Sequence, residues 1–380
     1  MDKVTVGSLC KKNAELIKMP ADALIDYFDI ASIDNKNKTI TEFSSYEFGK
    51  APSRARTAVN KNSILVSTVR PNLNAIAFFN IKTPNIPVVS TGFCVLDCKE
   101  DTNPLFLFYF LQSKSFIDEM VSKATGASYP AVSDKIVRNA LIPAYSYEKQ
   151  TKIADILDRL YSLATNKKQQ LSKLDQLVKA RFVEMFDNRK YPYKRIDDVC
   201  STIVDCPHST PKYNGELKNP AIRTSEIKKG YIAWDSMKYV SDEEYQERTS
   251  RLTPTAGDIV YGREGSLGNA AILPEGYKFC LGQRVMLLRP DYDLCSSGYL
   301  LHAIISDDIY RQVMKKNNAS TVAHVNVKDV KQFIIKLPPL NEQKKFEVEL
   351  NKINQIKLLV KQSLEKLETL KKSLMQEYFG

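Results

Sequence analysis

The sequence predicts an α+β protein: two similar mixed α/β domains, each followed by a long helix, with the two helices pairing as an antiparallel coiled coil. Three observations lead to this prediction. The 380-residue chain repeats once, each half opens with short β-branched and aromatic runs broken by Gly, Pro and Asn, and each half closes with a segment free of Gly and Pro. Such broken runs are typical of strands, and the uninterrupted segments favour long helices.

The internal repeat is clearest near the end of each half. Placing Gln150 on Gln343 aligns residues 150–186 with 343–379 without a gap, and 12 of the 37 pairs are identical. Chance alignment gives only about two or three, so the chain is a duplication. Fainter matches follow upstream, where Cys10 aligns with Cys200. The chain therefore divides into a domain over 1–142, a helical spacer over 143–190, a second domain over 191–335 and a second spacer over 336–380.

Each β-rich domain also contains one readable helix. The apolar spacing predicts a helix over 105–123 in the first domain and over 299–316 in the second. The remaining strands are expected to be short and irregular, because turn residues interrupt them frequently.

The two long helices carry a heptad pattern. Alternating steps of four and three residues from Ile153 and from Phe346 each meet eight apolar residues in ten positions, as in a coiled-coil seam. The alternative is a helix packed on its own domain. Further apolar residues at 163, 177, 356 and 370 widen the stripe and leave room for a partner. The residues predicted to lie between the helices or against partners are Leu157, Leu160, Leu171, Leu174, Leu350, Ile353, Leu364 and Leu367.

The charge balance favours a polyanionic partner. Lys and Arg number 55 against 44 acidic residues, which gives a net charge of +11 and points to nucleic acid ahead of a membrane surface. The longest strongly apolar stretch, residues 105–111, lies in only 12 uncharged residues, fewer than the roughly 18 that span a bilayer. No secretory signal is visible, so we expect a cytoplasmic protein without membrane attachment. The seven cysteines match no zinc or redox spacing and are expected to be reduced thiols.

Catalytic signatures are lacking in the sequence. Only three histidines occur, at 208, 302 and 324, and no phosphate loop, dinucleotide fingerprint or nucleophile elbow is present. The acidic run at 242–244 is expected to be solvated, and the glycine-rich segment at 262–268 is expected to be a turn. We therefore predict a chain that is not itself an enzyme and binds neither metal nor cofactor.

The remaining candidate function is binding, and the candidate binding residues include arginines in polar segments of both domains. Arginine reads guanine edges with two hydrogen bonds, while hydroxyl groups and lysines serve phosphates. A salt-bridge role is the competing interpretation for each arginine. The predicted DNA-binding residues are Arg54, Arg56, Arg70, Ser209, Thr210, Lys212, Arg223 and Arg263.

The arrangement resembles the specificity subunits of type I restriction-modification enzymes. The resemblance covers nearly the whole chain and depends on the repeat together with a Pro-Pro-Leu-x-Glu-Gln pattern at 338–343, whose counterpart between Pro143 and Gln150 is two residues longer. Segments of the second domain also look like one recurring type of target-recognition domain: 204–211, 222–223, 257–259, 263–265 and 281–284.

The resemblance implies that each recognition domain reads one half of a split, non-palindromic double-stranded DNA site, with the helices holding the halves at a fixed separation. It further implies two methyltransferase subunits that use S-adenosylmethionine, and restriction (motor-nuclease) subunits that use ATP and Mg²⁺. Two alternatives stay open: a duplicated coiled-coil scaffold that binds only protein, and a nuclease or methyltransferase with an unrecognised site.

Overall fold

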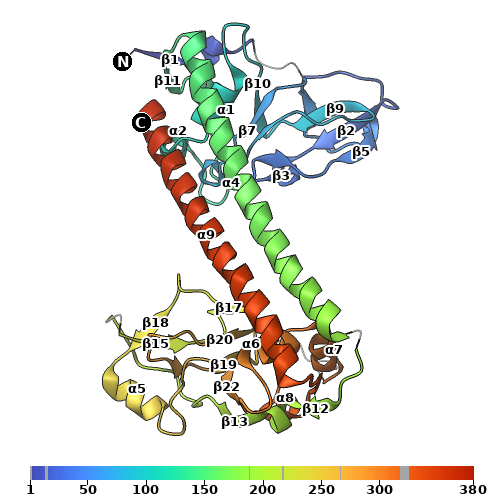
Figure 1. Ribbon diagram of the computed structural model, residues 1–380. Helices are drawn as coiled ribbons and strands as arrows, with labels where there is room; N and C mark the ends of the chain where they lie inside the picture. Colours follow the sequence, from blue (N-terminus) through green and yellow to red (C-terminus); the bar gives the residue numbers. More distant parts are fainter. Residues whose placement is uncertain (1, 13–15, 188, 216–217, 266, 317–324) are drawn as a thin grey trace. The chain divides into compact units, whose positions relative to one another are not determined.

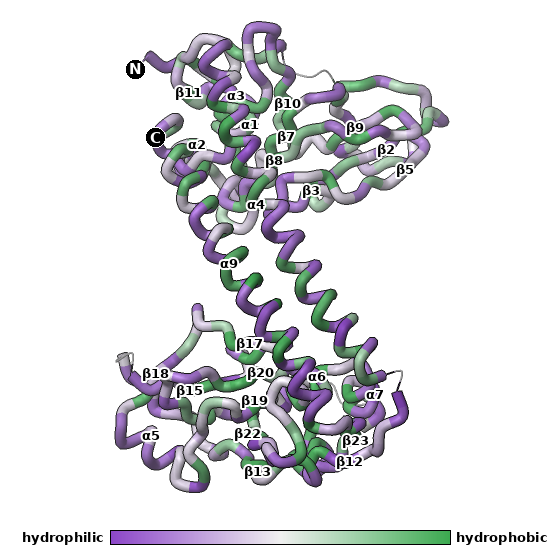
Figure 2. Tube along the Cα trace, in the orientation of Figure 1, coloured by the Kyte–Doolittle hydropathy of each residue, from purple (hydrophilic) through white to green (hydrophobic). Residues whose placement is uncertain are grey.

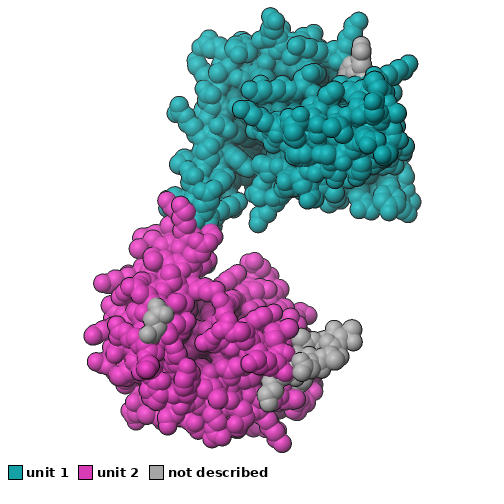
Figure 3. Space-filling view, turned by 90° about the vertical axis from the view of Figure 1, so that its right-hand side faces the viewer, with its two compact units in different colours: residues 1–169, 361–380 teal, residues 170–360 magenta. Residues whose placement is uncertain are grey.

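The computed structural model describes residues 2–12, 16–187, 189–215, 218–265, 267–316 and 325–380. The chain forms two compact units (Figure 3). Unit 1 comprises residues 1–169 and 361–380, and unit 2 comprises residues 170–360. Each unit therefore contains one β-rich domain and parts of both long helices.

Besides the long helices, three short α-helices and two two-stranded sheets (β1-β11 and β3-β4), unit 1 contains two larger sheets (Figure 1). One sheet has the strand order β10-β7-β8 and the other β5-β2-β9-β6, in which β2 and β9 run parallel. Its elements are β1 (Lys3–Thr5), β2 (Leu24–Phe28), β3 (Ile33–Asp34), β4 (Thr39–Ile40), β5 (Ser44–Glu47), β6 (Ala55–Ala58), β7 (Ile64–Ser67), β8 (Ile76–Phe78), β9 (Ile86–Ser90), β10 (Phe93–Leu96), α1 (Pro104–Phe110), α2 (Lys114–Lys123), α3 (Asp134–Arg138) and β11 (Leu141–Pro143).

Unit 2 repeats the central strands of these sheets and differs at their edges. Its two larger sheets have the orders β13-β22-β19-β20 and β14-β18-β15-β21, and the second again contains one parallel pair, β15 with β21. The strands β22-β19-β20 correspond to β10-β7-β8, and β18-β15-β21 correspond to β5-β2-β9, whereas β6 of unit 1 and β13 and β14 of unit 2 are added edge strands. Its elements are β12 (Tyr193–Arg195), β13 (Cys200–Asp205), β14 (Tyr213–Asn214), β15 (Asn219–Ile222), β16 (Ile227–Lys228), β17 (Tyr231–Ile232), β18 (Lys238–Val240), α5 (Asp242–Arg248), β19 (Ile259–Gly262), β20 (Ala270–Ile272), β21 (Cys280–Leu281), β22 (Val285–Pro290), α6 (Ser297–Ile304), α7 (Asp307–Lys316), α8 (Val327–Gln332) and β23 (Ile334–Lys336).

The two long helices are α4 (Tyr147–Phe182) and α9 (Leu340–Phe379). Figure 2 shows short apolar stretches alternating with polar ones along both. The predicted seam is the less exposed stripe. Leu157, Leu160, Leu350 and Ile353 are buried, and Leu171, Leu174, Leu364 and Leu367 are half-buried.

Ion pairs join the two helices within each unit. In unit 1, Lys168 of α4 lies 3.0 Å from Glu368 of α9. In unit 2, Arg181 of α4 lies 2.8 Å from Glu349 of α9. The first part of α4 thus meets the last part of α9 in unit 1, and the reverse holds in unit 2, which makes the contacts antiparallel. The supercoil of a coiled coil stays a prediction.

The helix ends also pack on the β-rich domains, so the alternative of packing on a domain is partly correct. Leu157 belongs to the core of unit 1. At the repeat-equivalent ends of the two helical segments, Phe186 belongs to the core of unit 2 and Phe379 to that of unit 1. The ring centres of Phe379 and Phe106 lie 5.4 Å apart, and those of Phe186 and Tyr299 lie 4.9 Å apart.

The prediction of one helix over 105–123 and one over 299–316 is wrong in the same way twice. Each segment is two helices, with breaks before α2 and α7. Ser113 accepts a hydrogen bond from the Phe116 backbone amide, and Ser306 accepts one from Ile309. These serines lie 193 residues apart. A serine side chain that caps the next helix ends the previous one, because it replaces the helical backbone acceptor.

A buried glutamine fastens each long helix to its domain. Gln150 accepts a hydrogen bond from the Asn103 amide (2.9 Å) and donates one to the Tyr145 carbonyl (2.9 Å). Gln343 accepts from the Ser296 amide (2.8 Å) and donates to the carbonyls of Leu294 and Pro338 (2.9 Å each). Asn103 and Ser296 cap α1 and α6. This side-chain bridge is therefore duplicated with the chain.

Candidate nucleic-acid interface

Arg54 and Arg56 of unit 1 flank the first residue of β6. Arg54 is exposed, and its carbonyl accepts a hydrogen bond from the Thr91 amide in the β9–β10 turn. Arg56 is half-buried, because its guanidinium donates to the Ala55 carbonyl (2.8 Å) and lies 4.6 Å from the centre of the Phe48 ring. Arg54 is thus the more available of the two for a phosphate or base.

Arg70 is exposed, but its neighbours fix its backbone and side-chain conformation. Its backbone has a φ of +49°, which L-residues with long side chains adopt only where neighbours hold them. Its amide donates to the Pro130 carbonyl (2.7 Å), and its guanidinium lies 4.7 Å from the centre of the exposed Tyr129 ring. Stacking on an aromatic ring leaves the N–H edge of arginine open to a further acceptor. Arg70 is therefore the best-placed predicted contact in unit 1.

In unit 2, Arg223 is part of a buried polar network. Its Nε donates to Oε2 of Glu226 at 3.0 Å, and its terminal nitrogen donates to the Ser236 carbonyl at 2.8 Å. Glu226 is fully buried and also accepts from the hydroxyls of Ser225 and Ser236. Burial raises the pKa of Glu226, but hydrogen bonds from Arg223 and the two serines outweigh it and hold the pKa below its usual range. Arg223 therefore joins the β15–β16 and β17–β18 loops.

Arg263 is likewise engaged within the fold. Its side chain is 9% exposed and lies 2.8 Å from Asp205 at the end of β13. The salt-bridge interpretation that competed for this residue thus has a specific partner. A DNA contact by Arg223 or Arg263 remains a prediction, and the ion pairs show what each also does for the fold.

The segment of residues 205–212 brings the other predicted contacts together. Ser209 accepts hydrogen bonds from Arg248 on both its hydroxyl (3.2 Å) and its carbonyl (2.8 Å). Asp205 is held by Arg263 at the opposite end. Between and beyond these anchors, Thr210 and Lys212 are exposed. The segment is thus pinned at two points while its polar side chains face solvent.

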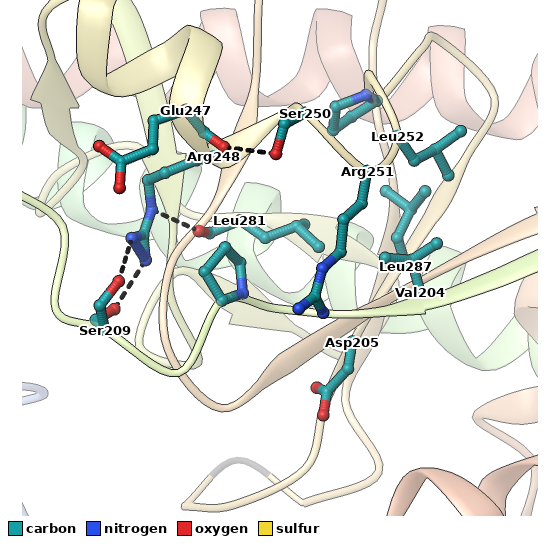
Figure 4. A pocket seen from close by; sticks show the side chains of 12 residues that line it. Val204, Asp205, Ser209, Glu247, Arg248, Ser250, Arg251, Leu252, Leu281 and Leu287 are labelled. Carbon is teal, nitrogen blue, oxygen red and sulfur yellow. Dashed lines mark hydrogen bonds between the residues drawn. The ribbon is translucent and has the colours of Figure 1, made fainter.

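Arg248 is the organising residue that sequence reasoning missed. Its side chain is only 1% exposed, and it also donates to the Leu281 carbonyl at 3.1 Å and pairs with Glu244. Figure 4 shows Arg248 reaching Ser209 on one side of a cavity of about 230 Å³, with Arg251 extending toward the β13 side. The expectation that residues 242–244 are all solvated is wrong for Glu244, which is buried. The spacing of Glu244 and Arg248 was the available signal.

Two further residues missed by sequence reasoning adjoin the same surface. The Tyr213 ring follows Lys212, and the Lys238 ammonium lies 4.7 Å from its centre. The Arg223 guanidinium lies 5.8 Å from the same ring. The Tyr213 ring, in the residue that follows the exposed Lys212, therefore lies beside two basic side chains, those of Arg223 and Lys238. A basic surface with an aromatic centre suits phosphates and base faces together.

The described ranges contain neither a metal-ligating cluster of side chains nor a helix that could span a membrane. Across them, no group of three or more His, Cys, Asp or Glu side chains could hold a metal ion. His324 lies outside those ranges. None of the helices described is both long and apolar enough to cross a bilayer.

The model of the type I restriction modification DNA specificity domain matches residues 3–176 and again residues 188–369. The chain therefore belongs to this family and carries two specificity domains. It is a DNA specificity protein of the type I restriction-modification class.

Individual relatives agree with this assignment. The chain is 23% identical over 339 residues to the type I restriction enzyme MjaVIII specificity subunit of Methanocaldococcus jannaschii, covering 83% of this chain and 78% of that protein. Its fold is similar to a chain from a structural study of the assembly and conformational transition of a type I restriction-modification system (TM-score 0.62, 21% identity, 100% and 97% coverage). It is also similar to the S subunit of M. genitalium (TM-score 0.59, 15% identity, 100% and 96% coverage).

Proposed function

We propose that each unit contacts one half of a bipartite, non-palindromic DNA site through the surfaces described above. This proposal depends on the observation that the two units share the central strands of their larger sheets but not their exposed polar side chains. Unit 1 offers Arg54 and Arg70, whereas unit 2 offers the pinned segment with Thr210 and Lys212. Two copies of one surface would read the same half-site twice, so diverged surfaces favour different half-sites.

The helices are proposed to bind two copies of one partner, the methyltransferase subunits. Leu163 and Leu370 are exposed in unit 1, and Leu177 and Ile356 are exposed in unit 2, all between 44% and 49%. The repeat relates Leu163 to Ile356 and Leu177 to Leu370. Each unit thus presents an equivalent apolar pair, one residue from α4 and one from α9. Equivalent exposed apolar residues favour identical partners.

Chemistry is proposed to reside in those partners. S-adenosylmethionine would serve the methyltransferase subunits, and ATP with Mg²⁺ would serve restriction subunits. The main alternative is a scaffold that binds only protein. It predicts that substitutions in the polar loops change no activity of the complex.

The experiment is DNA binding by the chain assembled with methyltransferase subunits, measured against salt. The affinity should fall with a log–log slope of about −0.9 for each phosphate contact, and the chain alone should transfer no methyl group. A salt-independent affinity would favour the scaffold, and methyl transfer by the pure chain would contradict the assignment of chemistry to partners.

A further inference from the structure

Two cysteines of unit 1 lie directly opposite each other on adjacent backbone segments. Cys10 follows the 3₁₀ turn Val6–Leu9, and Cys98 follows β10 by two residues. They form an antiparallel bridge. The Lys11 amide donates to the Asp97 carbonyl (2.7 Å) and the Lys99 amide to the Leu9 carbonyl (3.0 Å).

These flanking bonds define the geometry of the pair. In an antiparallel ladder, residues whose neighbours exchange the hydrogen bonds form the non-hydrogen-bonded pair, with Cα atoms about 4.5 Å apart and side chains close. A disulfide requires Cα atoms roughly 4.4–6.8 Å apart. The two thiols can therefore join without a large backbone movement.

The surroundings make one sulfur the nucleophile. The hydrogen bond with Cys98 is the largest influence that lowers the pKa of Cys10, burial opposes it, and the Arg138 charge adds to the lowering. Arg138 is itself fixed by hydrogen bonds to the carbonyls of Lys11 (3.0 Å) and Val95 (3.1 Å). Cys10 itself is buried and Cys98 beside it is partly exposed, so an oxidant would approach the pair from the Cys98 side.

We propose that Cys10 and Cys98 form a reversible disulfide when the protein meets a hydroperoxide. The Cys10 thiolate attacks the peroxide oxygen, which breaks the O–O bond and gives a sulfenic acid and hydroxide. The Cys98 sulfur then attacks the Cys10 sulfur, forms the S–S bond and expels the second oxygen. Counting protons, two thiols and one hydrogen peroxide give one disulfide and two waters, and a dithiol reverses the step.

The repeat supplies an internal comparison. Cys200, which aligns with Cys10, faces Pro290 across its ladder, so unit 2 cannot form this bond. Cys94 lies two strand positions from the end of β10 and pairs with Val66 of β7. It is fully buried. The bond is therefore specific to the first unit and to one pair within it.

The disulfide would close a loop over residues 11–97, which contains both larger sheets of unit 1. A crosslink over so long a loop stabilises mainly by restricting the unfolded chain. We expect the Tm of unit 1 to rise by up to roughly 10 °C on oxidation, with unit 2 unchanged.

The test treats the full chain with hydrogen peroxide and maps disulfides by non-reducing proteolysis and mass spectrometry. The expected product is a peptide pair joined through Cys10 and Cys98, lost on treatment with dithiothreitol. Cys10→Ser and Cys98→Ser should each abolish it, and Cys200→Ser is the matched control that should keep it. Peroxide should raise the Tm of the control and leave that of the two variants unchanged.

Two results would overturn the proposal. One is oxidation that leaves Cys10 and Cys98 as free thiols, or converts them to sulfinic acids without a bond. The other is pairing of either residue with Cys94 as the main product. Because both variants replace sulfur by oxygen of similar size, circular dichroism of the reduced proteins verifies folding before oxidation.

Discussion

Units 1 and 2 share the contacts that position their domains and differ in the polar side chains that they expose. These contacts repeat down to single hydrogen bonds, since Gln150 and Gln343 each tie a long helix to the residue that caps a short helix. The exposed side chains do not repeat: Arg70 of unit 1 stacks on Tyr129 at the surface, whereas Arg223 of unit 2 is tied to a buried carboxylate. The comparison teaches that the two halves kept the contacts that position the domains and differ in the exposed residues that are predicted to contact DNA.

The largest effect should come from removing the glutamine hydrogen bonds that fasten the long helices to the domains. Gln343→Leu leaves one amide and two carbonyls without partners, whereas Gln150→Leu leaves one of each. Each unpaired buried group costs about 1–3 kcal/mol. We expect losses in the free energy of unfolding of about 3–9 kcal/mol for Gln343→Leu and about 2–6 kcal/mol for Gln150→Leu. Urea unfolding measures both, and negligible losses in both variants would show that these bridges do not support the helices.

The next comparison is between Arg223, which stabilises the fold, and Arg70, which is predicted to contact DNA. Arg223→Ala leaves the buried Glu226 carboxylate without its main partner, so the free energy of unfolding should fall by about 2–4 kcal/mol. Arg70→Ala should change stability by less than about 0.5 kcal/mol and weaken DNA binding by about 1–3 kcal/mol if Arg70 reads a base. Thermal unfolding measures the stability of both variants, and binding titrations measure their affinity for DNA. Stability loss in Arg70→Ala, with none in Arg223→Ala, would reverse the assignment.

A smaller difference should appear in acid. His302 of α6 lies between the rings of Phe182 (6.1 Å) and Phe346 (5.3 Å), and burial, aided by the Lys357 charge, lowers its pKa to about 4. The unfolded chain binds a proton near pH 6.5 and the folded chain does not, so stability is full above pH 6.5 and falls as the pH drops toward 4. The loss approaches about 3 kcal/mol.

The repeat provides the control for this pH dependence. The equivalent residue in unit 1 is Tyr109, which donates to Asp158 at 3.1 Å and whose pKa burial raises, so it does not titrate in acid. His302→Phe should flatten the stability of unit 2 between pH 6.5 and 4 by the amount given above. An identical acid slope in the variant would place the effect on other groups.

Much of the fold could be predicted from the sequence because it depends on the internal repeat and on the spacing of apolar residues. The 193-residue offset and the seam steps identified the residues that are least exposed on α4 and α9, including Leu157 and Leu350. The single helices over 105–123 and 299–316 were wrong because apolar spacing continues across the break. A serine cap acts through one hydrogen bond, which periodicity does not register.

The site was less predictable because the role of an arginine depends on partners distant in the sequence. Arg263 pairs with Asp205 and Arg248 anchors Ser209, across 58 and 39 residues. A single sequence shows the arginine but not the acid or carbonyl that it meets. The close approach of Cys10 and Cys98 was hidden for the same reason.

The central claim is that the two units read separate halves of one site. The most direct measurement is selection of methylated sites from a randomised DNA library by the assembled complex, comparing the native chain with Arg70→Ala and Lys212→Ala. Both residues are exposed, one in each unit. We predict a bipartite site in which Arg70→Ala relaxes bases or lowers methylation through one half only, Lys212→Ala acts through the other half, and the spacer is unchanged. Effects of both variants on the same half, or a single uninterrupted site, would contradict the account.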